Sequence, residues 1–418
     1  MDPVFDAQYL PMRNLFLREG TEIEVAYTPD GEVDYIYVVG QLLARRRNVE
    51  RLQQTLPGLR PVERTDLGDL GDRPVPGDLV VLSIDALEGR RLTVPEALDR
   101  LDQSLGDANP ALHGEEPLAT PVHIMHTSKL CAASEPAVPC ESPPRPCPPP
   151  KAGEGRYPVR LGVCDTGLVR NLNLGLCPWL GGVQGDVDPL GPVLPGELPD
   201  IPYDGGHGTF VAGVARCMAP GATVYVGNHF TKSGGELEYV IVSKLEELIA
   251  ARRPALVNLS AGTYTRNNWP LLSFSDFLER HGGIILVAAA GNDSTNRRFW
   301  PAAFPRPSTI AVGALGADHQ NLAYFSNYGS WVDVYAPGEG LVNAFATGVY
   351  TYQEPPKRPT KQIFTGMARW DGTSFSAPLV AGLIADDVSH SGRSAADAAA
   401  HVLGTAQVIN GVGPALIP

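Results

Sequence analysis

The sequence contains Gly372-Thr373-Ser374-Phe375-Ser376-Ala377-Pro378, and an apolar segment follows it directly. This pattern predicts a helix that begins near Ser374, where free backbone N–H groups and the helix dipole favour a developing negative charge. Gly372 permits a tight approach of the backbone. Pro378 is compatible with the first turn or so of the helix, where N–H groups are unpaired. The stretch therefore predicts a serine hydroxyl held at a helix N-terminus.

Two further segments supply the groups that a serine nucleophile needs. Asp165 ends the apolar run Val159 to Val163 and continues into Thr166-Gly167, and His207 lies in Gly206-His207-Gly208-Thr209. A serine hydroxyl is a poor nucleophile until a base takes its proton. His207 would take the proton of Ser374, and Asp165 would fix the imidazole tautomer and stabilise the imidazolium. Each segment alone is typical of a turn or a helix start, but the three together predict a catalytic triad.

These residues resemble the subtilisin-like serine peptidases, the subtilase family, over roughly residues 158 to 415, and the order Asp, His, Ser is the order of that family. The segment Ala288 to Asn292 is similar to the family's oxyanion segment, and Leu259 to Gly262 is similar to its substrate-binding strand, which pairs with an extended peptide. The site that this resemblance implies consists of the catalytic residues Asp165, His207 and Ser374, the oxyanion donor Asn292, and the substrate-binding residues Ser260, Ala261, Gly262, Ala290 and Gly291.

Four features depart from the family's pattern. Phe210 stands where a second His is usual, and Ala261 stands where Leu is common, which would widen or reshape the pocket beside the attacked residue. Asp293 either faces that pocket or is a solvated loop carboxylate. The segment 339–369 is longer than in compact members of the family, and it either overhangs the substrate cleft or forms a surface insertion.

Eight prolines within residues 135–150 divide the chain, because such a run favours an extended spacer over a packed element. We expect an N-terminal α+β domain over residues 1–130, a Pro-rich linker over 131–157 and a subtilisin-like peptidase domain over 158–418. The linker is interpreted either as a passive spacer or as an exposed site of proteolytic processing.

The C-terminal region alternates apolar strands with helical segments between residues 159 and 290. Strands that are apolar throughout are typical of a parallel sheet with both faces covered, so we expect an α/β, subtilisin-like three-layer fold with a mostly parallel sheet. Asp165, Ser260 and Asn292 each follow directly from an apolar strand. We therefore expect them together at the carboxyl edge of the sheet.

The N-terminal region has the pattern β-α-β-β-α-β, the ferredoxin-like order. The expected strands are 35–39, 60–65, 78–84 and 121–126, and the expected helices are 42–56 and the segment after Thr93, which forms a capping box with Glu96. Residues 1–30 carry no assignment. This order resembles the inhibitory propeptides of subtilases, which would place residues near 127–134 in the cleft. The alternative is a permanent domain that recruits a protein substrate.

The formal net charge of −13 and the pI of about 5.2 disfavour nucleic acid or an anionic membrane as a partner. No signal peptide pattern and no apolar run of about 20 residues is present, so the expected location is the cytoplasm. The expected partner is a protein or peptide substrate. No cofactor and no metal ligand set is indicated, and structural calcium is implied by the family resemblance only.

We therefore predict a serine endopeptidase that hydrolyses peptide bonds through an Asp-His-Ser triad and an Asn-assisted oxyanion hole, with self-processing in the linker. The alternative is a peptide-binding pseudoenzyme whose N-terminal domain recruits a partner.

Overall fold

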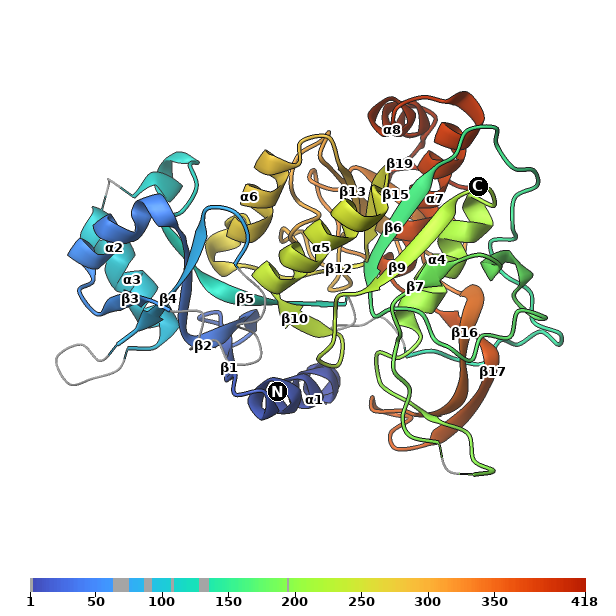
Figure 1. The fold of residues 1–418 in the computed structure, drawn as a ribbon, viewed down its shortest axis with the longest axis horizontal. Helices are drawn as coiled ribbons and strands as arrows, with labels where there is room; N and C mark the ends of the chain where they lie inside the picture. Colours follow the sequence, from blue (N-terminus) through green and yellow to red (C-terminus); the bar gives the residue numbers. More distant parts are fainter. Residues whose placement is uncertain (1–2, 63–74, 86–91, 107–108, 128–134, 194) are drawn as a thin grey trace.

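The computed structural model describes residues 3–62, 75–85, 92–106, 109–127, 135–193 and 195–418. Figure 1 shows a small sheet with its helices at one end of the molecule and a larger layered unit at the other end. Strand β5 (Ala119–Thr127) runs from the first unit into the second.

The larger unit is built on a nine-stranded sheet with the order β18-β19-β15-β14-β13-β11-β6-β9-β7. All neighbouring strands in it are parallel except β18 and β19. The bounds are β6 (Arg160–Asp165), β7 (Gln184–Gly185), β9 (Thr223–Asn228), β11 (Leu256–Leu259), β13 (Ile285–Ala289), β14 (Thr309–Leu315), β15 (Val334–Pro337), β18 (Gln407–Ile409) and β19 (Gly413–Ala415).

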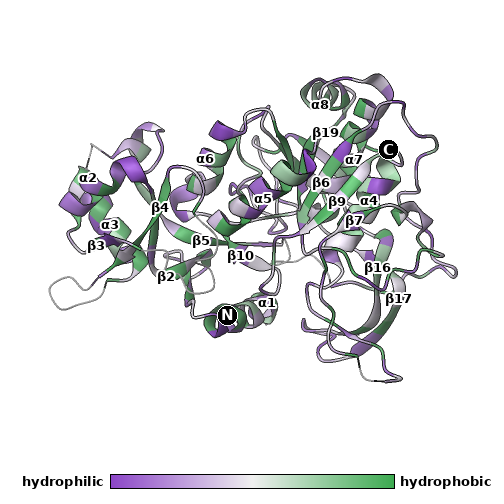
Figure 2. Cartoon of the chain, in the orientation of Figure 1, coloured by the Kyte–Doolittle hydropathy of each residue, from purple (hydrophilic) through white to green (hydrophobic). Residues whose placement is uncertain are grey.

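Helices cover both faces of this sheet. One face carries α4 (His207–Met218) and α7 (Thr373–Ser391), with α8 (Ala395–Gly404) packed against α7, and the other carries α5 (Glu238–Arg252) and α6 (Leu272–Arg280). Each face has its own apolar core, and hydrophobic residues concentrate in the central strands (Figure 2). The three-layer α/β fold expected from the sequence is confirmed.

The smaller unit has the antiparallel strand order β5-β2-β4-β3, with β1 added beside β2. This is the ferredoxin-like arrangement of a β-α-β-β-α-β segment. The bounds are β1 (Ile23–Tyr27), β2 (Val33–Arg45), α2 (Val49–Thr55), β3 (Leu59–Pro61), β4 (Leu79–Ile84) and α3 (Val94–Leu105). The capping box of α3 is present, because the Glu96 amide donates to Thr93 Oγ1 and the Thr93 amide donates to Glu96 Oε2.

The helix expected over residues 42–56 was partly wrong. Residues 42–45 belong to β2, and α2 starts only at Val49, after the 3-10 turn Arg46–Asn48. Leu42 and Leu43 are fully buried on opposite faces of a strand that pairs with β4 on one edge and β5 on the other. Pairing on both edges therefore overrides the helical spacing of the local sequence.

Helix α1 (Pro3–Arg18), which the sequence left unassigned, joins the two units. Its buried side chains Phe5, Met12 and Phe16 share one apolar core with Leu237 and Tyr239 of the larger unit. Met12 lies against Gly235, which begins the short strand β10 (Gly235–Leu237). The contact between the units is therefore apolar at its centre.

The Pro-rich segment lies against the larger unit. Ala137 and Cys147 form β-bridges with Arg369 and Val342 of a long hairpin, β16 (Leu341–Thr351) and β17 (Lys361–Trp370). That hairpin forms a three-stranded sheet with β8 (Asp200–Ile201). The described part of the linker is thus joined to the hairpin at these two points, while most of its side chains are exposed.

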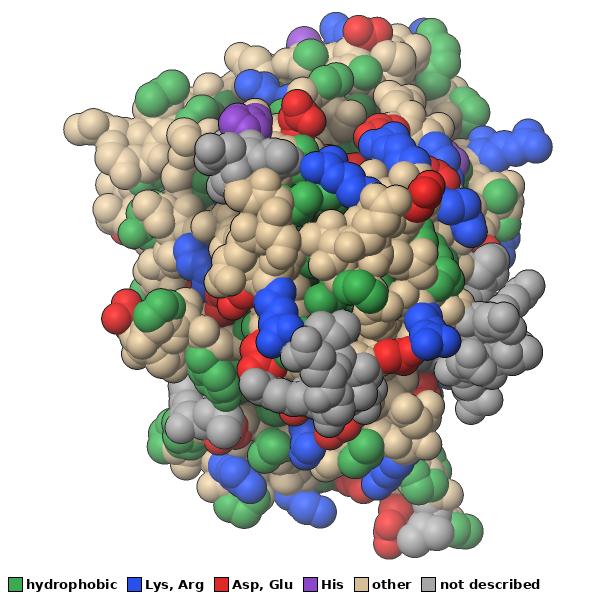
Figure 3. Space-filling model, turned by 90° about the vertical axis from the view of Figure 1, so that its left-hand side faces the viewer, with side chains coloured by type: hydrophobic (Ala, Val, Ile, Leu, Met, Phe, Trp, Pro, Cys, Tyr) green, Lys and Arg blue, Asp and Glu red, His purple; other side chains and the backbone are tan. Residues whose placement is uncertain are grey.

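The face of the molecule shown in Figure 3 mixes acidic and basic side chains, which do not gather by sign. Within the described residues, no helix has the length and apolar character that a membrane crossing requires.

We predict that Thr93→Ala, made in a Ser374→Ala background, lowers the free energy of unfolding by about 1 kcal/mol, because the N-terminus of α3 loses its cap. Thermal unfolding with far-ultraviolet circular dichroism measures the change. Ser104→Ala, at an exposed position of the same helix, is the control and is expected to change stability by less than about 0.5 kcal/mol. Equal effects of both substitutions would contradict the capping role.

Candidate active site

The carboxyl end of β6 and the N-terminus of α4 place an acid beside an imidazole. Asp165 Oδ1 lies 2.7 Å from His207 Nδ1, and both side chains are buried. Asp165 Oδ1 also accepts a hydrogen bond from the Thr166 amide. Among the described residues, Nε2 of His207 has no hydrogen-bond partner. The carboxylate therefore orients the ring and leaves its second nitrogen available.

Ser374 lies in the first turn of α7, as the sequence predicted. Its Oγ donates to the backbone oxygen of Ser260 at 3.3 Å, and its own backbone oxygen accepts from Ser260 Oγ at 2.7 Å. Asn258 Nδ2 in turn donates to Ser260 Oγ. The end of β11 therefore fixes the start of α7. Rotation about the Cα–Cβ bond of Ser374 changes the direction of its hydroxyl.

Asn292 follows β13 and has a defined orientation. Its Oδ1 accepts from the Thr373 amide at 2.9 Å and from Thr373 Oγ1 at 2.8 Å. A backbone N–H can only donate, so the oxygen faces Thr373 and the amide nitrogen is the end nearer Gly372. The start of α7 also carries N–H groups with no acceptor inside the helix. This corner of the site is therefore rich in donors.

Aromatic rings enclose the imidazole. Trp370 lies edge-on to His207 at 5.6 Å between centroids, and Phe375 lies at 5.4 Å. Phe210, the residue in place of a second His, packs against both of these rings. Because Trp370 ends β17, the long hairpin forms one wall beside the imidazole. Trp370 lies one residue beyond segment 339–369, so this contact does not decide between the two alternatives for that segment.

A buried carboxyl group that the sequence analysis missed lies behind the Asp–His pair. Asp188 Oδ2 accepts from Thr166 Oγ1 at 3.0 Å and from the Gly206 amide at 2.8 Å. Thr166 Oγ1 accepts in turn from the Gly208 amide. Burial and then the charge of Asp204 raise the pKa of Asp188 to about 8. Asp188 thus ties the residue after Asp165 to both neighbours of His207.

Two short strands of the larger unit flank the end of β5. Residues 124–126 pair antiparallel with β10 on one side, and residues 126–127 pair with β12 (Ala261–Gly262) on the other. The Thr127 amide also donates to the Gly234 oxygen. An extended segment of the chain therefore lies between the strand expected to bind substrate and β10, where β5 leaves the small sheet (Figure 1).

The described chain resumes at Glu135, because residues 128–134 lie outside the described residues. The carboxylate of Glu135 is buried and accepts hydrogen bonds from Tyr350 and from the Gln353 amide. Ala137 then forms its bridge with Arg369, five residues before Ser374. Ser374 is only 2% exposed. The segment that follows residue 134 thus contacts the hairpin that ends at Trp370, beside His207.

Asp293 is not a solvated carboxylate. Its Oδ2 accepts from the Tyr264 hydroxyl at 2.5 Å, and burial raises its pKa to about 7. Asn327 Nδ2 donates to the same hydroxyl and to the Ala290 oxygen, and Asn327 Oδ1 accepts from the Asp293 amide. This network holds the segment that contains Ala290 and Gly291 in place beside Asn292.

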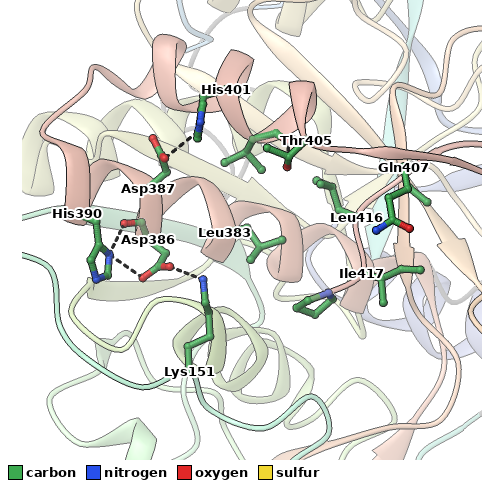
Figure 4. Close-up of a pocket in the computed structure, with 13 residues that line it drawn as sticks. Lys151, Leu383, Asp386, Asp387, His390, His401, Thr405, Gln407, Leu416 and Ile417 are labelled. Carbon is green, nitrogen blue, oxygen red and sulfur yellow. Dashed lines mark hydrogen bonds and ion pairs between the residues drawn. The ribbon is translucent and has the colours of Figure 1, made fainter.

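A separate cavity of about 320 Å³ lies at the far end of α7 (Figure 4). Its carboxylates are already paired, Asp386 with Lys151 and Asp387 with His401. Asp386 and Asp387 are 12 and 13 positions along α7 from Ser374, which is about 18 Å or more at 1.5 Å per residue. Within the described residues, no group of three or more His, Cys, Asp or Glu side chains is placed to hold a metal ion.

The chain belongs to the subtilase family, because residues 194–412, just over half of its length, match the model described as "Subtilase family". A thermophilic serine proteinase of Bacillus sp. strain AK1 is 32% identical over 243 residues, which cover 53% of each chain. Thermitase of Thermoactinomyces vulgaris is 29% identical over 266 residues, which cover 61% of this chain and 83% of thermitase. The chain thus spans about half the length of the first of these relatives.

A solved structure shares the fold over most of the chain. Fervidolysin of Fervidobacterium pennivorans, a keratinolytic enzyme related to subtilisin, matches with a TM-score of 0.55 and 18% identity. The match covers 91% of this chain and 60% of fervidolysin. It therefore supports the overall architecture.

We predict that the free energy of unfolding of Asp188→Asn, compared with that of the protein that retains Asp188, increases as the pH rises from 5 to 8. Both proteins carry Ser374→Ala. A raised carboxyl pKa means that the native state binds more protons than the unfolded state between about pH 4 and 8, so stability falls as pH rises. Asn stays neutral and can accept the same two bonds. The slope is at most about 1.4 kcal/mol per pH unit.

Thermal unfolding at several pH values measures this difference. Asp186→Asn, an exposed neighbour, is the matched control. Parallel stability curves for Asp188→Asn and the reference protein would show that Asp188 does not titrate in this range.

Proposed function

We propose that this chain is a serine endopeptidase made as a self-inhibited precursor. The observation that carries the proposal is the pairing of Thr127 with Ala261, the residue next to Ser260, whose backbone oxygen accepts from Ser374 Oγ. A segment held in extended form on the strand that leads to a serine hydroxyl is the arrangement that positions a peptide for hydrolysis.

The proposed mechanism uses the groups that converge at the sheet edge. The Ser374 hydroxyl rotates from the Ser260 oxygen toward the available Nε2 of His207, which takes its proton as Oγ attacks the peptide carbonyl. Such hydrogen bonds often tighten only when substrate is bound. Asp165 stabilises the imidazolium, which then gives its proton to the leaving amine. Water releases the acyl group from Ser374 by the same route in reverse.

Donors at the start of α7 stabilise the negative charge that develops on the carbonyl oxygen. The amide nitrogen of Asn292 is oriented by the two bonds that Thr373 makes to its oxygen, so little reorganisation is needed during reaction. The chemistry uses these side chains and water. Calcium, if bound, would serve stability and remains an expectation from the family resemblance.

The N-terminal region, residues 1–130, is proposed to act as the inhibitor. Beyond the pairing of β5, it is held by ion pairs from Arg45 to Asp276 at 3.0 Å and from Arg297 to Asp34 at 2.5 Å. We propose that self-cleavage falls within residues 128–134 and leaves this region bound to the cleft until it is removed. The pairing of β5 favours inhibition over a recruitment role, because a recruiting domain would leave the cleft open.

We predict that the purified wild-type chain is cut into two fragments and that Ser374→Ala stays full length, because only the wild-type chain has the Ser374 hydroxyl as a nucleophile. Intact mass spectrometry of parallel incubations measures this. Ser376→Ala is the matched control, since its hydroxyl bonds to Ala336 and Pro337 oxygens away from the cleft, and it is expected to be cut. If wild type and Ser374→Ala both stay intact and neither digests a denatured protein, the chain is a peptide-binding pseudoenzyme.

We predict that Asn292→Ala slows self-cleavage by about 10²–10³-fold, or about 2.7–4 kcal/mol, a magnitude that comes from a subtilisin and not from this chain. The rate constant is followed by gel densitometry, and the unfolding midpoint of the same variant is measured to confirm that the fold is retained. A loss of less than about fivefold in a folded variant would remove Asn292 from the oxyanion site.

A further inference from the structure

We infer that Phe299 closes the pocket beside Ser374, so that the peptidase cuts after a small residue, Gly, Ala or Ser. This inference rests on the proposed function and names the substrate class of the same site.

The register of β5 identifies the pocket. His126 lies opposite Gly262 and Thr127 lies opposite Ala261, so a substrate residue one step further along lies opposite Ser260. The Ser260 oxygen contacts Ser374 Oγ, and this substrate residue therefore supplies the attacked carbonyl. Side chains alternate along a strand, which puts its side chain on the same face as that of His126.

The ring of Phe299 occupies that face. It lies 6.0 Å from the His126 ring between centroids and is 1% exposed. A Cβ added to Gly262 would lie 2.4 Å from this ring, and one added to Gly291 would lie 3.1 Å from it. The ring thus fills the space between the substrate-binding strand and the segment that leads into Asn292.

The ring is backed by groups that keep it in place. Tyr264 packs edge-on to Phe299 at 5.2 Å, and its hydroxyl is held by Asp293 and Asn327. The guanidinium of Arg297 lies 4.5 Å from the centre of the Tyr264 ring. For the pocket to admit a large side chain, Phe299 would have to move and displace Tyr264 and its hydrogen-bond partners. Close-packed interiors resist such a change.

Ala261 affects a different position. Its side chain is buried in the same apolar cluster as Met125, on the face opposite His126. The replacement of Leu by Ala therefore changes the space around Met125, and it does not enlarge the pocket that Phe299 fills.

The chain itself offers a test, because residues 128–134 read Ser-Lys-Leu-Cys-Ala-Ala-Ser. Mass spectrometry of both fragments from the wild-type chain locates the cut. We expect it after Ser128, because this residue follows Thr127 in the sequence and the register puts the attacked carbonyl one step beyond Thr127. A cut after Lys129, Leu130 or Cys131 would overturn the inference while leaving the proposed peptidase function intact.

A second experiment uses the self-cleaved protein after removal of its N-terminal fragment, and a library of peptides that differ only in the residue before the scissile bond. We expect wild type to cut after Ala or Ser at least about tenfold faster than after Phe, and Phe299→Ala to raise cleavage after Phe at least about tenfold, a range typical of hydrophobic pockets. Phe304→Ala, which loses the contact of the Phe304 ring with Trp300, is the control and should keep the wild-type preference.

If Phe299→Ala fails to fold, Phe299→Leu removes less volume and should give the same change in preference to a smaller extent. Faster cleavage by the wild-type protein after Phe than after Ala would overturn the inference that Phe299 closes the pocket. Failure of wild type to cut any peptide, together with an intact chain, would instead contradict the proposed function itself.

Discussion

The pairing of β5 with β10 and β12 is the interaction on which the rest of the structure depends. It ties an N-terminal sheet to the larger unit at the strand that follows Ser260, whose oxygen accepts from Ser374 Oγ. Main-chain pairing of this kind recognises an extended backbone whatever its sequence, and side-chain pockets then add selectivity. The same contact therefore explains both a covered site and the way in which a peptide substrate would bind.

The remaining architecture serves to bring separate strand ends together. Asp165 ends β6, Ser260 follows β11 and Asn292 follows β13, so the parallel sheet sets their spacing. Asp188 and Thr166 then fix the two loops that carry the acid and the base. A buried carboxyl with a raised pKa costs stability at neutral pH, and its retention beside the Asp–His pair is consistent with a positioning role.

The sequence predicted the elements whose signals are local. The apolar strands, the capping box at Thr93 and the position of Ser374 at a helix start each depend on a few neighbouring residues. Residues 42–45 became a strand because β4 and β5 pair with both edges. Asp188, Phe299 and the contacts of α1 could not be predicted, because their roles arise from residues distant in sequence that meet only in the folded chain.

Amide hydrogen exchange of the full-length Ser374→Ala chain tests the central claim most directly. If the end of β5 lies between β10 and β12, the amides of residues 124–127 and 235–237 are expected to exchange slowly and together, with a protection close to that of the central sheet. Rapid exchange of residues 124–127 beside a protected central sheet would contradict the account, because the cleft would then be open and the N-terminal domain would not fill it.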